Sequence, residues 1–111
     1  MGFILIMSTI YKHTEAHIYS HKFWTDCTEP QELRETFERF LTEVDFTIVL
    51  FNEHHFTEQG YTCFWLLGES HLAIHTFPES SKSYVELSSC NKAKRDLFVL
   101  KVNAQKNISI A

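Results

Sequence analysis

The sequence is short of positive charge. Ten Lys and Arg residues stand against fourteen Asp and Glu residues, so the net charge is −4 with the seven His counted as neutral. The one basic cluster, Lys92, Lys94 and Arg95, is too small for a nucleic-acid or anionic-membrane surface, because both need an extended basic patch. We therefore expect no nucleic-acid partner and no membrane partner.

Cysteine and membrane-length apolar runs are also lacking. The three cysteines, Cys27, Cys63 and Cys90, cannot all pair, and their spacing matches no zinc or Cys-x-x-Cys motif. The apolar start from Met1 to Met7 is too short to span a bilayer and lacks the flank and cleavage site of a signal peptide. It is either an extra edge strand or a segment upstream of a true start at Met7. The sequence therefore predicts a cytoplasmic protein in a reducing compartment.

A single domain over residues 1–111 is expected, because no linker, low-complexity run or internal repeat divides so short a chain. Its clearest element is a helix. Thr28 fits an N-cap, Pro30 falls in the first turn and Gln31 follows the cap by three residues. Apolar residues then recur at helical spacing, which predicts an end near Val44 or Asp45.

The remaining pattern is that of a sheet. Segments with β-strand character cover residues 16–24, 46–51, 61–67, 71–77, 84–87 and 97–102, with a polar connection over 52–60. This predicts an α+β fold, a two-layer α/β sandwich in which an antiparallel-rich sheet carries one helix on one face. The other face needs a cover, and a second copy of the chain could supply it, since so small a domain buries only a modest core.

One stretch carries candidate chemistry. From Gly68 to Glu79 the chain runs Gly-Glu-Ser-His-Leu-Ala-Ile-His-Thr-Phe-Pro-Glu, and Cys90 follows His75 by fifteen residues. This closely resembles the prokaryotic S-adenosylmethionine decarboxylases, in which a Glu-Ser-His tripeptide leads a strand that ends in His-Thr-aromatic-Pro-Glu. The matching core covers about residues 52 to 91. The upstream positions that also match the family are His54, Phe56 and Gly60.

The resemblance implies a precursor that cuts itself between Glu69 and Ser70. The Ser70 hydroxyl would attack the Glu69 carbonyl, and elimination from the resulting ester would leave dehydroalanine, which hydrolyses to a pyruvoyl group. Gly68 suits this step, because backbone attack needs an open or strained turn. The products would be chains 1–69 and 70–111. The pyruvoyl cofactor derived from Ser70 would form a Schiff base with the substrate amine and accept electrons as carbon dioxide leaves.

The resemblance also implies roles for five other residues. Cys90 would be the general acid that returns a proton to the substrate, and His75 would assist self-cleavage. Thr62 stands where the family usually has a serine that supports proton transfer. Phe56 would stack on an adenine ring and Glu79 would accept hydrogen bonds from ribose hydroxyls. The implied reaction is decarboxylation of S-adenosylmethionine for spermidine synthesis.

The spacing of Ser70 and His75 favours a homodimer. The two residues are five apart on one expected strand, and an odd separation places side chains on opposite faces of a sheet. The resemblance implies two shared sites per dimer, with Ser70 and Cys90 from one subunit and the other site residues from its partner. A β-bulge in the strand is the alternative.

Two other functions stay open. The same pyruvoyl chemistry could act on arginine or ornithine, which would not need Phe56 and Glu79. An uncut homologue could instead serve as a binding or regulatory module. A metal site is not expected, because no carboxylate or Cys spacing completes a ligand set around the histidines. The family usually has a second helix after the position of Cys90, whereas residues 91–96 leave room for one turn.

Overall fold

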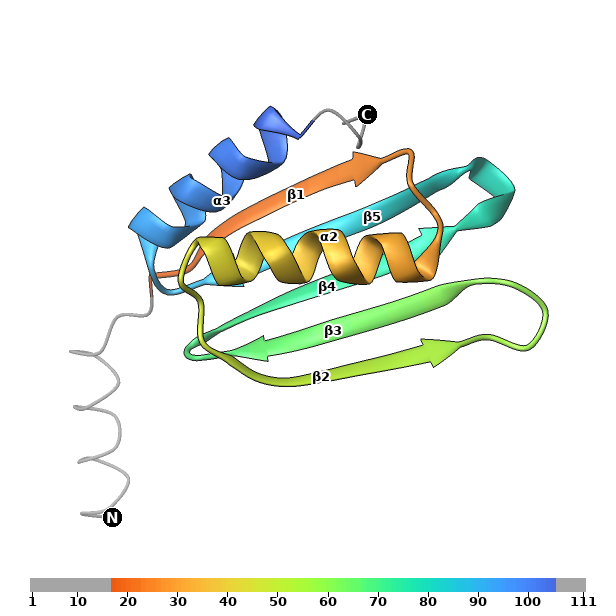
Figure 1. The fold of residues 1–111 in the computed structure, drawn as a ribbon, viewed down its shortest axis with the longest axis horizontal. Coiled ribbons are helices and arrows are strands. Elements are labelled where there is room, and N and C mark those ends of the chain that lie inside the picture. The colour runs from red at the N-terminus through yellow and green to blue at the C-terminus, as the bar shows by residue number, and fades with distance from the viewer. Residues whose placement is uncertain (1–16, 106–111) are drawn as a thin grey trace, which may run out of the picture.

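The computed structural model describes residues 17–105, so the expectation for Met1 to Met7 lies outside the described residues. The elements follow in the order β1 (Tyr19–Thr25), α2 (Pro30–Glu43), β2 (Ile48–His55), β3 (Tyr61–Leu67), β4 (Ser70–Phe77), the 3₁₀ helix η1 (Pro78–Ser80), β5 (Lys82–Ser89) and α3 (Lys92–Ala104). Figure 1 shows the strands side by side, with α2 running along the middle of the sheet and α3 beside β1.

The strands form one antiparallel sheet in the order β1-β5-β4-β3-β2. The central strand, β4, pairs without a register shift with β3 on one side and β5 on the other. Both connections of β4 are short, since two residues join it to β3 and η1 leads into β5. The candidate motif therefore lies along the middle of the sheet.

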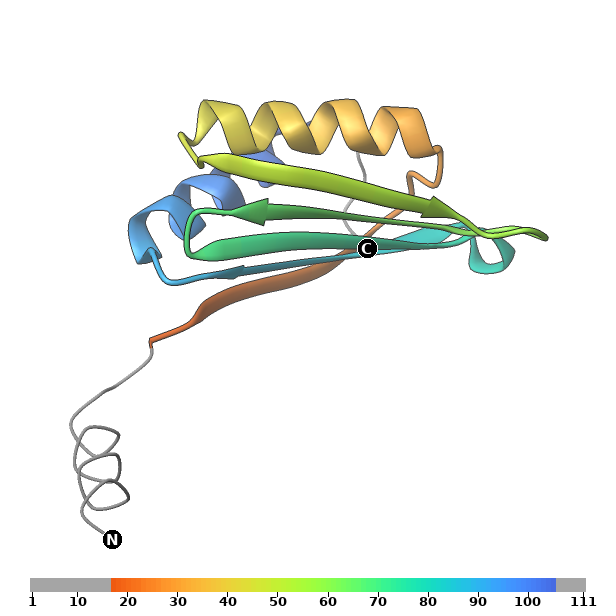
Figure 2. The same cartoon turned by 90° about the horizontal axis from the view of Figure 1, so that it is seen from below.

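Strict alternation along the strands divides the sheet into two faces. In β3 the buried side chains are Tyr61, Cys63, Trp65 and Leu67, and in β4 they are Ser70, Leu72, Ile74 and Thr76. These side chains meet the helices on what is called here the covered face. Figure 2 shows α2 and α3 on the same side of the sheet. The opposite side is the open face, and neither α2 nor α3 lies over it.

The helix α2 packs its apolar side on the covered face. Leu33, Phe37, Phe40 and Leu41 are buried, as the helical spacing predicts. The cap differs from the prediction, because Glu29 and not Thr28 is the N-cap, and its carboxylate accepts a hydrogen bond from the Glu32 N–H at 2.7 Å. Pro30 occupies the first helical position, so the preceding residue takes the cap.

The expected strand over 97–102 is wrong, because residues 92–104 form the helix α3. Asn91 caps this helix by accepting the Lys94 N–H at 3.0 Å. Phe98 and Val102, four residues apart, are buried, and the Phe98 ring lies 6.4 Å from the rings of both Phe37 and Phe40. A short apolar run does not distinguish strand from helix by pattern alone. The family's second helix is therefore present.

The strand β2 also differs from the prediction. It runs from Ile48 to His55, so residues 52–55 extend the strand beyond the expected end at Phe51. They pair with the first residues of β3, with His54 opposite Thr62 and His55 opposite Tyr61. Cross-strand pairing overrides the polar character of this segment. The fold class is confirmed as an α+β two-layer sandwich, with two helices in place of one.

Candidate active site

The turn between β3 and β4 holds the expected cleavage bond. Leu67 pairs with Ser70, so Gly68 and Glu69 form a two-residue connection. Glu69 has a φ of 60°, a left-handed conformation that side chains with a Cβ rarely adopt. The sequence assigned the conformational freedom to Gly68, but the left-handed residue of this turn is Glu69. The Gly68 N–H donates to the Thr47 carbonyl at 3.0 Å, which ties the turn to the segment before β2.

Ser70 is the first residue of β4 and lies on the covered face, where it is 7% exposed. Its hydroxyl donates to Ser89 Oγ at 2.9 Å across the β4–β5 pair. Cys90 follows Ser89 directly and is exposed, whereas Cys63 is buried and Cys27 half-buried. The cleavage bond and the expected general acid therefore lie at the same end of the sheet.

His75 and Thr62 form a pair on the open face. They lie opposite each other in the β3–β4 register, and Thr62 Oγ1 is 3.0 Å from His75 Nδ1. Which atom donates depends on the imidazole tautomer. The threonine thus keeps the hydroxyl contact at this position despite its extra methyl group.

Phe56 and Glu79 lie just beyond the ends of β2 and β4. Phe56 follows β2 and is 52% exposed, its N–H donates to the Gly60 carbonyl at 3.0 Å, and its ring lies 4.6 Å from that of His54. His54 is the cross-strand partner of Thr62, so Phe56 stands close to the His75 pair. Glu79 is exposed in η1, two residues beyond the end of β4.

The site residues therefore fall into two groups within one chain. Ser70, Glu69 and Cys90 lie at one end of β4 and β5, while His75, Thr62, Phe56 and Glu79 lie toward the other end. Ser70 and His75 are five positions apart along β4, a distance of roughly 16 Å at about 3.3 Å per residue. Ser70 points to the covered face and His75 to the open face. The bulge alternative is wrong, because β4 has no register shift.

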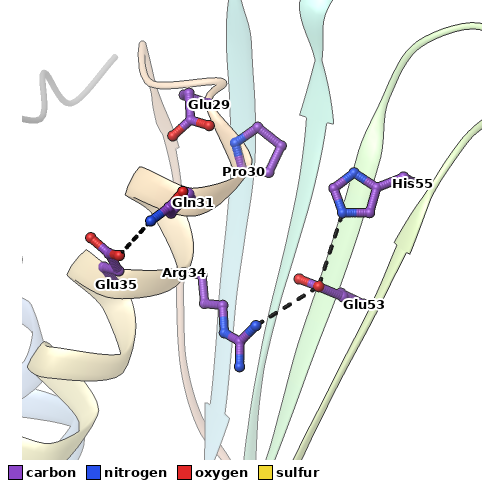
Figure 3. Close-up of a pocket in the computed structure, with 7 residues that line it drawn as sticks. All are labelled: Glu29, Pro30, Gln31, Arg34, Glu35, Glu53 and His55. Atoms are coloured by element: carbon purple, nitrogen blue, oxygen red, sulfur yellow. Dashed lines mark hydrogen bonds and ion pairs between the residues drawn. The ribbon is translucent and has the colours of Figure 1, made fainter.

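Two hollows of the described surface lie away from the cleavage bond. A hollow of about 460 Å³ lies between the start of α2 and β2. Figure 3 shows the residues that line it, among them Glu53, which lies 3.8 Å from Arg34 and 4.0 Å from His55. The hollow contains none of the sequence-predicted site residues. A second hollow, of about 310 Å³, is lined in part by Thr62, His54 and Phe64, so it adjoins the His75 pair. Cys63, which also lines it, is a buried thiol whose pKa is raised by burial to about 12.

Next to these hollows, Tyr61 donates a hydrogen bond to Glu53. Burial, together with this bond, raises the pKa of the Tyr61 hydroxyl well above its usual range. Across residues 17–105 no cluster of three or more His, Cys, Asp or Glu side chains is arranged to hold a metal ion. No helix in that range is long and apolar enough to cross a membrane.

Ser89 is a residue that the sequence analysis missed. It is 1% exposed and contacts the hydroxyl expected to act as the nucleophile. The residue carries no motif signal of its own, because its contact with Ser70 arises from the β4–β5 register. Its place directly before Cys90 was visible in the sequence, but a serine at that place gives no hint of the partner.

Comparison with known proteins agrees with the motif. A family model described as S-adenosylmethionine decarboxylase matches residues 12–106. A proenzyme of that name from Prochlorococcus marinus (strain MIT 9211) is 49% identical over 37 residues, which make up 33% of this chain and 30% of the relative. Its counterpart from Prochlorococcus marinus (strain MIT 9313) is 38% identical over 58 residues, or 52% of this chain and 46% of the relative. The alignments thus span less than half the length of these relatives.

The fold gives an independent likeness. The crystal structure of the adenosylmethionine decarboxylase from Aquifex aeolicus VF5 superposes with a TM-score of 0.61 at 21% identity, over 88% of this chain and 89% of that one. At this identity the likeness concerns the fold alone. The family model, by contrast, matches nearly the whole length of the chain. The chain therefore belongs to the S-adenosylmethionine decarboxylase family.

Proposed function

We propose that this chain is a precursor that cuts itself between Glu69 and Ser70 and then decarboxylates S-adenosylmethionine with a pyruvoyl group derived from Ser70. The observation that carries the proposal is the left-handed Glu69, φ 60°, directly before a buried serine hydroxyl. Backbone strain of this kind collects at functional sites. Family membership and the proenzyme names of the relatives support the same reading.

The cleavage consumes no second reactant until its last step, which uses water. Ser70 Oγ attacks the Glu69 carbonyl carbon, the Oγ–C bond forms, the C–N bond breaks, and the hydroxyl proton ends on the freed Ser70 nitrogen. Loss of the Ser70 Cα proton then breaks the Cβ–Oγ bond and releases the Glu69 carboxylate. Water finally displaces ammonia from the remaining dehydroalanine and leaves the pyruvoyl group at the start of chain 70–111. That ketone supplies an electron sink for the decarboxylation.

The other residues have roles that suit their places. Cys90 presents an exposed thiol at the cleavage end of the sheet, where it can hold the proton that returns to the substrate carbon. His75 and Thr62, hydrogen bonded at 3.0 Å, form a proton-handling pair for self-cleavage. Phe56 offers an exposed ring for the adenine and Glu79 an exposed carboxylate for the ribose hydroxyls.

A homodimer joins the two groups. In one chain the Glu69–Ser70 bond lies in the turn at the start of β4 and His75 lies five positions further along the strand on the open face, so a second subunit that runs the opposite way along the open face would bring its His75 group to the cleavage end of the sheet. The open face supports this, because it exposes aromatic rings to solvent: Trp24 is 39% and Phe77 38% exposed, and their rings lie 5.6 Å apart. Burial of these rings against a second sheet would stabilise the dimer.

Three free thiols fit a protein of the cytoplasm.

Co-expression tests the shared site. Ser70→Ala and His75→Ala are each expected to be uncut when expressed alone. Together they would form one complete site per heterodimer, with Ser70 from one chain and His75 from the other, so part of the His75→Ala chain should be cut. No cleavage in the mixture, with mixed dimers verified by affinity tags, would contradict the shared site.

Substrate choice is tested on the cut protein. Release of labelled carbon dioxide is measured from carboxyl-labelled S-adenosylmethionine, arginine and ornithine in parallel. The proposal predicts release from the first alone. Release from arginine or ornithine in its place would assign the same pyruvoyl chemistry to another amino acid.

A further inference from the structure

A short hydrogen-bonded chain links the Ser70 hydroxyl to the start of α3. Ser70 Oγ and Ser89 Oγ are 2.9 Å apart, and both side chains are buried on the covered face. The Asn91 N–H donates to Ser89 Oγ at 3.0 Å, and the Asn91 side chain accepts the Lys94 N–H at 3.0 Å. The Ser70 hydroxyl is therefore hydrogen bonded to Ser89, which β5 and the capped helix α3 hold in place.

The acceptors in this series of hydrogen bonds show which hydroxyl donates to which. A serine hydroxyl has one hydrogen to donate and two lone pairs. The Ser89 hydrogen is directed to the Asn91 carbonyl oxygen at 3.3 Å, so the hydrogen between the two serines belongs to Ser70. With its hydrogen donated to Ser89, Ser70 Oγ keeps both lone pairs for the attack on a carbonyl carbon.

We propose that Ser89 is a positioning residue for self-cleavage, which holds the Ser70 hydroxyl in the orientation that attacks the Glu69 carbonyl. This inference rests on the proposed function. Ser89 forms no covalent bond during the reaction, and through its hydrogen bond to Ser70 Oγ it acts on the first step, in which the acyl group moves from the Ser70 nitrogen to Oγ. Without its acceptor, the Ser70 hydroxyl turns among its rotamers, and the attacking geometry is populated less often.

The test compares two side chains of nearly equal shape. Ser89→Thr keeps the hydroxyl and Ser89→Val does not, while both are β-branched and suit a strand. Full-length precursor is made by pulsed cell-free translation, and its loss is followed by intact mass measurement under denaturing conditions. We expect Ser89→Thr to cut within about threefold of the wild-type rate. Ser89→Val and Ser89→Ala should be slower by roughly ten- to a hundredfold.

A matched control separates positioning from general loss of packing. Ser83 is also a buried serine of β5 on the covered face, and its hydroxyl donates to the Cys27 carbonyl at 2.6 Å. Ser83→Ala loses a buried hydrogen bond far from the cleavage bond, so it should lower Tm about as much as Ser89→Ala while cutting at the wild-type rate. Equal slowing of Ser83→Ala and Ser89→Ala would overturn the positioning role.

Hydroxylamine identifies the step. It cleaves the ester as soon as it forms, so the rate of trapped cleavage reports the acyl shift alone. Ser89→Val should be slowed in this assay too. If the wild type is cut after residue 69 but Ser89→Val is trapped or cut at the normal rate, the role of Ser89 is overturned and the proposed function stands. A wild-type chain that never cuts there would overturn both.

Discussion

Replacement of Glu69 by glycine tests whether backbone strain contributes to cleavage. Glu69 has a φ of 60°, a conformation that costs a residue with a Cβ roughly 1–2 kcal/mol. Glycine avoids this cost but loses about 0.5–1 kcal/mol through the greater freedom of its unfolded chain. The two effects leave a net gain of about 0.5–1 kcal/mol, which should raise Tm by a few degrees. Stability is measured in a Ser70→Ala background, where no chain is cut.

The same strain should affect the rate of cleavage. If attack on the Glu69 carbonyl releases about 1 kcal/mol of strain, Glu69→Gly loses that advantage and should cut about fivefold more slowly. The matched control is Glu69→Ala, which removes the side-chain carboxylate but keeps the Cβ, so its stability and cleavage rate should stay close to wild type. Both are followed in the pulsed translation assay.

The pattern of the two variants decides the interpretation. A stabilised and slowed Glu69→Gly beside a normal Glu69→Ala is the expected outcome. Faster or unchanged cleavage in Glu69→Gly would refute the idea that strain at this turn assists the reaction. Equal slowing of both variants would show that the side-chain carboxylate of Glu69 contributes to cleavage and that its backbone conformation does not.

Cys90→Ala should still be cut, because the thiol takes no part in the acyl shift, but its turnover of S-adenosylmethionine should fall by roughly 10²-fold or more; normal turnover would remove Cys90 from the acid role. Limited alkylation of the native protein should label the exposed Cys90 well before the buried Cys63, as peptide mass mapping would reveal, and labelling of Cys63 first would contradict the burial. Burial raises the pKa of Cys63 from 9.0 to about 12. Between these pH values the folded chain keeps a proton that the unfolded chain loses. The free energy of unfolding should therefore fall as pH rises from about 9 to about 12, by up to about 1.4 kcal/mol per pH unit. Urea unfolding at stepped pH would measure this, and Cys63→Ala should lack the decline between pH 9 and 10. Phe56→Ala should raise KM for S-adenosylmethionine by roughly tenfold with little change in self-cleavage, and an unchanged KM would exclude ring stacking.

Most of the sheet could be predicted from the sequence, because its strands alternate strongly. The segment 61–67 matches β3 residue for residue, and the expected start of β4 is off by one. The alternation also placed Ser70 and His75 on opposite faces, as found. These features are local, and the period of two is independent of what the strand pairs with.

The errors arose where tertiary contacts decide. The segment Leu97 to Leu100 is apolar and β-prone, yet Leu97 and Leu100 stay exposed at 50% and 65% while Phe98 packs under α2. Residues 52–55 are polar and still pair with β3. The hydrogen bond from Ser70 to Ser89 joins residues nineteen apart in the chain and depends on the register between β4 and β5, which no single-sequence pattern reveals.

The most direct measurement of the central claim is the intact mass of the purified protein under denaturing conditions. Self-cleavage between Glu69 and Ser70 predicts two chains, residues 1–69 and residues 70–111, with the second beginning in a pyruvoyl group that reacts with carbonyl reagents. Ser70→Ala, prepared alongside, should give one chain. A wild-type protein that remains a single chain of 13.1 kDa, or that is cut at another bond, would contradict self-cleavage between Glu69 and Ser70.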